Sequence, residues 1–424
     1  MDRLTRFVRG ASTLALGAGL LAGCDRMGSD EERLAREVRE RVPQVEQATG
    51  LKFRQPPKVE ARSRAQVREF VLRKFDEEQP AQELAGEEQA YKLLGLIPDT
   101  MNLRAFITDL LTEQIVGFYD PTTKVLYVVE GGDADQRGVV ITHELVHALQ
   151  DQYVNLDSIM RATGDADRTS AAQALIEGHA TYEQIRLMLG KNGFASGLGG
   201  WQQVREMIRE NQASTPVFAS APVLIQESIL FPYLTGADFV HRYKQQRGDT
   251  ANPLARFPQS SEQLLHTSAF LGDSIDRPTR VVLPAPTGGT RAHESNLGEF
   301  GTRLFLYEHL SNITSATSAA MGWDGDRYVV VRTPRGNAIA WLTVWDSPLE
   351  AAEFGQQLER AVGRRYETGS PVAMTGNAKR WIVQNRAIVI TPGEIGGRTV
   401  VLYIDAPAGT EGGLLELGKV RLEQ

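Results

Sequence analysis

The sequence has little of several residue types, and each shortage excludes a class of protein. A single cysteine among 424 residues excludes a disulfide framework, a zinc ribbon and an iron–sulfur cluster held by one chain. Aromatic residues are scarce at 7%, but 42% of the residues are hydrophobic, which is enough for two or three globular cores. The 46 basic and 53 acidic residues are mixed along the chain, so no basic face indicates a nucleic-acid partner.

The chain also lacks an apolar stretch long enough to cross a membrane, and its most apolar segment lies at the amino terminus. Three arginines, the last at position 9, precede an apolar run from Ala11 to Leu21. A basic start followed by so short an apolar run is typical of an export signal. The run ends in Leu21-Ala22-Gly23-Cys24, which resembles the lipobox of bacterial lipoproteins.

The lipobox resemblance implies that residues 1–23 are a signal peptide and that Cys24 becomes the lipidated first residue. We therefore expect an exported protein, anchored by lipid to the cell membrane or the outer membrane and facing the periplasm or the exterior. The alternative is a short N-terminal helix that ends in cysteine by chance.

The rest of the chain divides into regions that differ in their predicted secondary structure. Residues 24–100 are predicted to be a tether and helices, 101–285 a mostly helical domain with a hairpin, 286–321 a connector and a helix, and 322–424 a small α+β domain. The hairpin is predicted from two β-rich runs, 115–119 and 124–129, around a turn at 120–123. Further predicted helices are 138–153, 170–189, 201–211, 221–246, 297–310 and 348–362, and further strands 328–332, 338–345, 380–391 and 399–404.

One motif with clear chemistry lies inside an apolar helical run. His143-Glu144-Leu145-Val146-His147 has the pattern HExxH. Two histidines four residues apart stand above one another on one helix face and can share a zinc ion, with Glu144 beside them. The alternative is a pair of core histidines next to a surface glutamate.

A catalytic zinc site usually takes three protein ligands, so the motif lacks one. The segment Glu177-Gly178-His179-Ala180 offers it, and small residues around Glu177 would allow its helix to approach the first. His179 points about 200° away from Glu177 on an ideal helix, so the two cannot both ligate without distortion. Glu177 is the preferred third ligand, with His179 and Glu183 as alternatives.

HExxH followed by Glu177 resembles the glutamate-zincins, the thermolysin-like branch of zinc metallopeptidases, and the Glu177-Gly178-x-Ala180 segment resembles a bacterial and archaeal group within it. The resemblance implies an α+β zincin-like catalytic domain over 101–285, with zinc on His143, His147 and Glu177. It also implies that Glu144 is the general base in peptide hydrolysis. The gap between the two motif helices is longer than in thermolysin-like enzymes, so the groups that orient the ligands stay open.

Looser similarity to that group extends over 231–236 and 261–266, which contain two candidate donors to the oxyanion, Tyr233 and His266. A structural role is the alternative for both. Asp151, one turn after His147, either orients a ligand or faces solvent. Zincins bind peptide as an added strand on a sheet edge, and 124–129 is the strand nearest the motif helix in sequence; an ordinary hairpin covering the core is the alternative.

These patterns together predict a lipid-anchored, zinc-dependent endopeptidase of the cell envelope. Its expected partners are a peptide or protein substrate and, through the lipid, a membrane, but not nucleic acid. Two other hypotheses remain: a non-catalytic envelope lipoprotein that uses a zincin fold for binding or assembly, and a zinc hydrolase of non-peptide amides.

Overall fold

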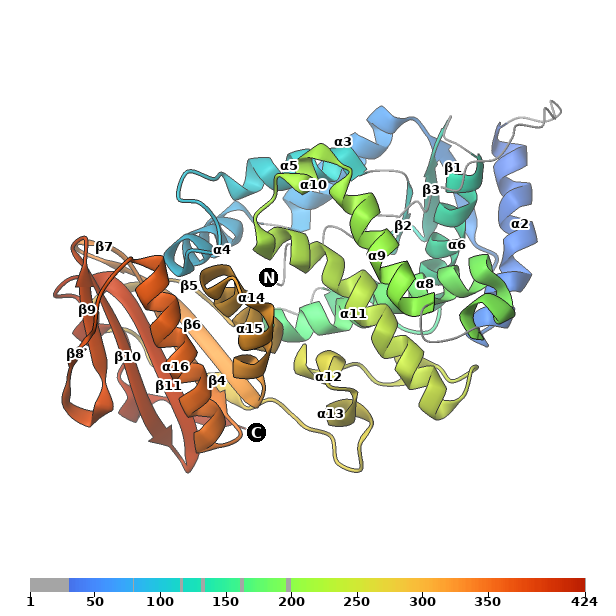
Figure 1. Ribbon diagram of the computed structural model, residues 1–424. Coiled ribbons are helices and arrows are strands. Elements are labelled where there is room, and N and C mark those ends of the chain that lie inside the picture. Colours follow the sequence, from blue (N-terminus) through green and yellow to red (C-terminus); the bar gives the residue numbers. More distant parts are fainter. Residues whose placement is uncertain are drawn as a thin grey trace.

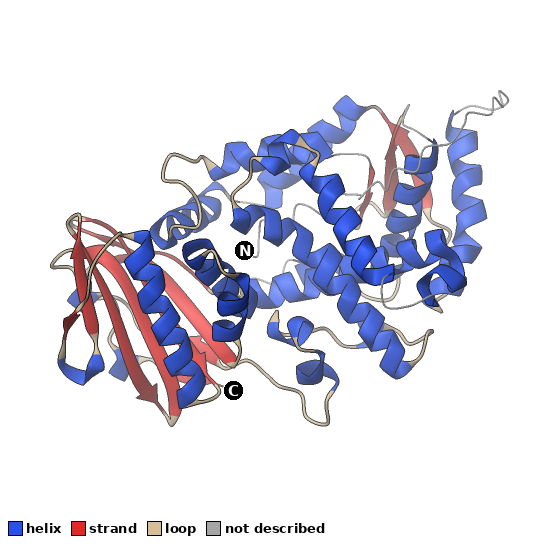
Figure 2. Cartoon of the chain, in the orientation of Figure 1, coloured by secondary structure: helices blue, strands red, loops and turns tan. Residues whose placement is uncertain are grey.

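The computed structural model describes residues 30–78, 80–114, 117–130, 134–160, 164–195 and 200–423. Helices make up most of the chain before residue 280, and a large sheet makes up most of the rest (Figures 1 and 2). The chain is therefore α+β, as predicted. Cys24 and the segment predicted to be a signal peptide lie outside the described residues, and none of the helices described is long and apolar enough to span a membrane.

The elements have the following bounds. The helices are α2 (Asp30–Thr49), α3 (Arg64–Glu78), α4 (Ala81–Leu94), α5 (Leu103–Gln114), α6 (Ala134–Gln150), α7 (Leu156–Met160), α8 (Ala166–Ala195), α9 (Gly200–Ala213), α10 (Pro216–Ala219), α11 (Val223–Arg247), α12 (Glu262–Leu265), α13 (Thr267–Leu271), α14 (Gly298–Leu310), α15 (Ile313–Ala320) and α16 (Pro348–Arg365). The strands are β1 (Lys58–Arg62), β2 (Gly117–Asp120), β3 (Val125–Val129), β4 (Arg280–Val282), β5 (Thr290–Ser295), β6 (Trp323–Thr333), β7 (Gly336–Trp345), β8 (Val372–Ala373), β9 (Lys379–Val383), β10 (Arg386–Ile395), β11 (Arg398–Pro407) and β12 (Arg421–Glu423).

A small sheet of order β1-β3-β2 lies beside α6. The predicted hairpin forms as β2 and β3, which pair antiparallel, and β1 adds to β3 in parallel. Because β3 is paired on both sides, it cannot accept a peptide strand, and the expectation that 124–129 is the substrate edge is wrong. The edge next to the motif helix is β2.

The motif helix α6 is held by apolar contacts on the side away from its histidines. Ile141, Leu145 and Leu149 are fully buried in a cluster with Leu126 of β3 and Val38 of α2. An ion pair of 2.8 Å between Arg137 and Glu37 also joins α6 to α2. The N-terminal helix is therefore part of the core that fixes the orientation of α6.

Helices α8 and α11 cross at glycine on both sides. A Cβ added to Gly178 would lie 2.0 Å from the carbonyl carbon of Gly236, and one added to Gly236 would lie 1.9 Å from the carbonyl oxygen of Ala174. Only glycine fits at such a distance. The small residues around Glu177 thus allow α8 to pack closely against two helices. Gly178 and Ala174 contact α11, and Ala180 packs in the cluster with α6.

The C-terminal part contains an antiparallel sheet of seven strands, in the order β5-β6-β7-β11-β10-β9-β8, and a separate antiparallel pair of β4 and β12. Helices α14, α15 and α16 lie against one face (Figure 1), where Trp345 stacks on Phe354 with ring centroids 4.6 Å apart. The sheet begins at Thr290, so the segment predicted as a connector supplies the edge strand β5. The run 380–391, predicted as one strand, is the hairpin β9–β10, because Gln384 and Asn385 take the left-handed conformation and reverse the chain.

Candidate metal centre

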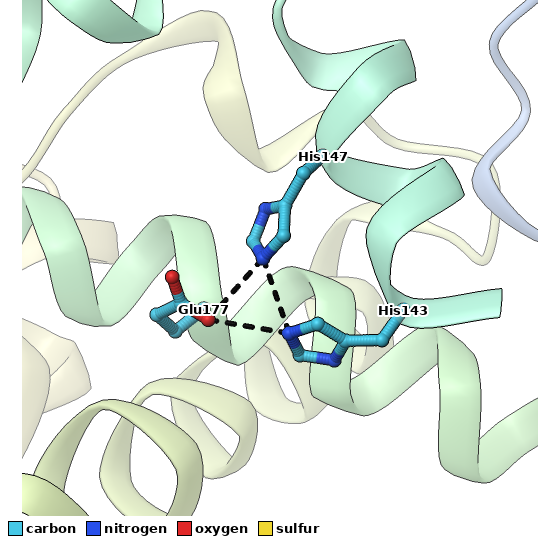
Figure 3. Close-up of side chains that lie close together, drawn as sticks. All are labelled: His143, His147 and Glu177. Atoms are coloured by element: carbon cyan, nitrogen blue, oxygen red, sulfur yellow. Dashed lines mark hydrogen bonds and ion pairs between the residues drawn. The ribbon is translucent and has the colours of Figure 1, made fainter. Parts of the chain in front are cut away.

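Three buried side chains converge between α6 and α8, as Figure 3 shows. The Nε2 atoms of His143 and His147 are 3.1 Å apart, and Oε2 of Glu177 lies 3.2 Å from the first and 3.3 Å from the second. None of the three residues is more than 4% exposed. This His143–His147–Glu177 cluster could bind a metal ion.

The dimensions of the cluster fit a zinc ion. With bonds of about 2.0–2.1 Å, the ligand atoms of a tetrahedral zinc site lie about 3.3–3.4 Å from one another. The three edges measured here are 3.1, 3.2 and 3.3 Å. Two imidazole nitrogens and one carboxylate oxygen are also donors that zinc accepts, and three of them leave the fourth position open.

Each histidine is oriented by a glutamine behind it. His143 Nδ1 lies 3.0 Å from Oε1 of Gln184, and His147 Nδ1 lies 2.9 Å from Oε1 of Gln150. The Gln150 amide nitrogen donates to the carbonyl of Ile176 at 2.9 Å, which fixes its oxygen toward His147. Since an amide oxygen only accepts, each Nδ1 must donate, and each neutral ring then turns an Nε2 lone pair toward the centre.

Three electron-rich atoms therefore face one another in a space from which water is nearly excluded. Burial by itself raises the pKa of Glu177, but whenever His147 or His143 holds a proton toward it, that charge and hydrogen bond outweigh burial and bring the pKa well below its ordinary value. Glu177 is thus a carboxylate, the form that binds metal. A cation at the centre would balance the converging lone pairs, which is why the donor set fits a metal rather than a proton alone.

Glu144 lies beside the cluster without belonging to it. It is 2% exposed, and its Oε2 accepts a hydrogen bond of 2.7 Å from the backbone N–H of Tyr119 in β2. Burial is the largest cause that raises the pKa of Glu144, and the charges of His147 and His143 partly oppose it. Burial therefore makes the carboxyl group of Glu144 readier to take a proton than an exposed glutamate, while the N–H of Tyr119 opposes this shift and fixes the position of the group.

Asp151 neither orients a histidine of the cluster through its side chain nor faces solvent, the two alternatives that the sequence left open. Its side chain is 1% exposed and accepts from the Tyr119 hydroxyl at 2.8 Å, from Lys124 Nζ at 2.5 Å and from the Leu156 backbone at 3.2 Å. Asp151 thus ties the hairpin β2–β3 to the end of α6. Together with the Tyr119–Glu144 bond, this contact sets the edge strand relative to the metal cluster.

The other two candidates for third ligand lie behind the cluster. His179 Nδ1 is 3.2 Å from the Gln150 amide nitrogen, so it accepts a hydrogen bond there and its proton is on Nε2. Burial, and then the charge of Lys244, keep the pKa of His179 far below its ordinary value. Glu183 forms a fully buried ion pair with Lys244 of α11. Of the three residues, the structure brings only Glu177 to the histidines of α6.

The two candidate oxyanion donors are placed differently. Tyr233 of α11 is 2% exposed, and its ring centroid lies 6.3 Å from that of His143. His266, between α12 and α13, makes its hydrogen bond to Glu299 of α14 at 2.8 Å, and none of its described contacts is with the metal cluster. The structure therefore brings Tyr233, and not His266, to the cluster.

The sequence analysis missed the groups that orient the ligands. Gln150 follows His147 by three residues and Gln184 follows Glu177 by seven, so each shares a helix face with a ligand. That spacing is the only signal in the sequence, and it is weak because glutamine is common on helices. The Lys244–Glu183 pair gives no such signal, since 61 residues separate its members.

Comparison with known proteins gives a family match over part of the chain. A family model described as a domain of unknown function, DUF8575, matches residues 283–412, which contain β5 to β11. No curated protein matches the chain. A crystal structure of a proposed hydrolase with a novel fold from Chloroflexus aurantiacus has 18% sequence identity and a TM-score of 0.36, covering 64% of this chain and 97% of that one. At that TM-score the likeness supports no conclusion about this protein.

Proposed function

We propose that the protein is a zinc-dependent endopeptidase in which His143, His147 and Glu177 hold the metal. The observation that carries this proposal is the triangle of ligand atoms, with edges of 3.1–3.3 Å, beside a buried glutamate that is not a ligand. A zinc site that serves structure alone has four protein ligands and does not require such a glutamate. The arrangement therefore favours catalysis over a purely structural or binding role.

The chemistry divides between the metal and the chain. Zinc held by this donor set would act as a Lewis acid on a substrate carbonyl and lower the pKa of water. Glu144 would take a proton from the attacking water and deliver it to the leaving amine, as a general base and then a general acid. The backbone bond from Tyr119 keeps one oxygen of Glu144 fixed while the other is left for this transfer.

The substrate is proposed to lie along β2. In the antiparallel pair β2–β3 the outer backbone groups alternate, and the N–H of Tyr119, which points to Glu144, is one that faces away from β3. A peptide added to this edge would therefore run past Glu144. Because main-chain bonds hold such a peptide, this mode of binding suits an endopeptidase with a broad choice of side chains.

Tyr233 remains the candidate for stabilising the oxyanion, because its ring is next to that of His143. His266 is no longer part of the proposed catalytic group, since its described partner is Glu299. The proposed location is the cell envelope, with the lipid on Cys24 as the anchor, which follows from the sequence Leu21-Ala22-Gly23-Cys24.

The test is cleavage of an unfolded protein by zinc-loaded wild type and by Glu144→Gln. We expect the variant to keep its fold and lose activity by about 10²–10⁴-fold, the usual worth of a general base. Glu353→Gln, the same change at an exposed site on α16, should cleave like wild type. Fully zinc-loaded wild type that cuts nothing would favour the binding role instead, and equal cleavage by Glu144→Gln would point to another catalytic group.

A further inference from the structure

A second group of acidic side chains meets at the junction between the helical part and the C-terminal sheet. Glu262 comes from α12, Asp276 from the loop between α13 and β4, and Asp346 from the turn between β7 and α16. One carboxylate oxygen of each lies within 4.8 Å of the other two. Two segments that are close in sequence and a turn 70 residues further on thus bring three carboxyl groups to one point.

Glu262 is the unusual member of this group, because it is only 6% exposed. Among the residues that the structure describes, no side chain or backbone group forms a hydrogen bond or ion pair with its carboxyl group, and the same holds for the exposed side chains of Asp276 and Asp346. Two positive groups of this region bind other carboxylates: His266 binds Glu299, and Arg398 binds Asp324 at 2.9 Å.

A buried carboxylate with no partner is costly, and its neighbours here increase the cost. Burial, followed by the charges of Glu299, Asp276 and Asp346, raises the pKa of Glu262 to about 9. Burial and the nearby Asp324 raise the pKa of Asp346 to about 6. Protonation would relieve this repulsion by removing charge, whereas a bound cation would relieve it and also use all three carboxylates as ligands.

We propose that Glu262, Asp276 and Asp346 bind a divalent cation of the hard class, with Ca²⁺ as the occupant. All the donors are carboxylate oxygens, which Ca²⁺ prefers and which contrast with the nitrogen-rich cluster of α6. With bonds of about 2.3–2.6 Å, two oxygens around one Ca²⁺ lie at most about 4.6–5.2 Å apart. The three carboxylate oxygens here lie within 4.8 Å of one another, so one ion can contact all of them. The exposed Asp276 and Asp346 leave an entry path and room for water ligands.

The backbone holds these carboxylates in place before any ion binds. The N–H of Asp276 donates to the carbonyl of Ala269 at 2.9 Å, and the N–H of Asp346 donates to that of Gly322 at 2.9 Å. The Gln263 side chain donates to the Asp276 carbonyl. The bound ion joins α12 and the 272–279 loop to the β7–α16 turn, so it stabilises the contact between the helical part and the sheet.

Binding is measured by titrating the zinc-loaded chain with Ca²⁺ in a calorimeter and with Tb³⁺ by luminescence excited through tryptophan, since Trp345 precedes Asp346. One ion per chain is expected. Glu262→Gln and Asp346→Asn should each weaken binding by at least about tenfold without changing the zinc content. Asp273→Asn, in the same loop but outside the group, should bind as wild type does.

Thermal unfolding gives a second readout that does not depend on the probe. Saturating Ca²⁺ should raise the melting temperature of wild type by a few degrees, because the ion binds only the folded state. Glu262→Gln should melt higher than wild type without Ca²⁺, because wild type must either protonate this carboxyl group or bury it charged when it folds. The variant should gain nothing from the ion. The site would be overturned if wild type did not bind the ion, or if Glu262→Gln and Asp346→Asn both bound it as tightly as wild type does. Either result holds whatever the outcome at the zinc cluster.

Discussion

Replacing Gly178 by alanine tests the crossing of α8 and α11 that carries Glu177 to the metal cluster. In an ordinary helix interior this change stabilises a protein by about 1 kcal/mol, because glycine is a poor helix former. At this crossing the new Cβ would lie 2.0 Å from the carbonyl carbon of Gly236, where an ordinary contact is at least 3.4 Å. The two backbones would have to separate by about 1.4 Å, the difference between the two distances.

Such a separation costs stability because the atoms that the new Cβ meets belong to the backbone of α11, which cannot rotate away as a side chain can. Overpacking in cores costs about 1–3 kcal/mol even where side chains yield, so we expect Gly178→Ala to lower the free energy of unfolding by about 3 kcal/mol or more. The shift also displaces Glu177, the preceding residue, from its position against the histidines. The variant should therefore bind zinc more weakly as well as unfold more easily.

The assay is denaturant unfolding followed by far-ultraviolet circular dichroism, together with zinc content. Gly355→Ala is the matched control, since Gly355 lies inside α16 and an added Cβ would meet nothing within 4 Å. The control should gain about 0.5–1 kcal/mol while Gly178→Ala loses stability. If Gly178→Ala were as stable as Gly355→Ala, the close crossing of α8 and α11 would be refuted.

Three further predictions concern the surroundings of the site and the anchor. Gln184→Leu, which removes the acceptor behind His143, should weaken zinc binding by about 10–100-fold in competition with a chelator, and unchanged affinity would show that the amide does not orient the ligand. Lys244→Met, which leaves the buried Glu183 with the more distant Arg186 at 3.7 Å, should cost about 3 kcal/mol in unfolding experiments. Adding Glu183→Leu should recover most of the loss, and no recovery would show that the cost does not come from burying this charge. Cys24→Ala should leave an unprocessed precursor that takes up no labelled fatty acid, whereas continued labelling would remove the lipid anchor from the proposal.

The parts of the fold that sequence predicts well are those decided by neighbouring residues. The hairpin is one example, because Asp120 accepts bonds from the N–H groups of Thr122 and Thr123 and so shapes the turn locally. The motif helix is another, since its apolar residues and its two histidines repeat at helical spacing. The small residues beside Glu177 favour it over His179 as the third ligand, and the structure brings Glu177 to the histidines.

The parts that sequence does not predict depend on contacts between distant segments. The sequence did not show that β3 is an inner strand, because its second partner β1 is far away along the chain. Val125 pairs with Lys58, and no local pattern indicates that pairing. The meeting of Gly178 with Gly236 and of Lys244 with Glu183 is equally non-local. His266 ends a short helix near the predicted site, but Glu299 of α14 binds it, and only the tertiary structure could reveal that partner.

Zinc content, measured on purified wild type and three variants, tests the central claim most directly. We expect about one zinc per chain in wild type, most of it lost in Glu177→Gln, and full content in His179→Gln and Glu144→Gln, because only three side chains form the donor triangle. Zinc that survives Glu177→Gln and disappears in His179→Gln would contradict the assignment of the third ligand. Wild type that takes up no zinc at all would contradict the metal site itself.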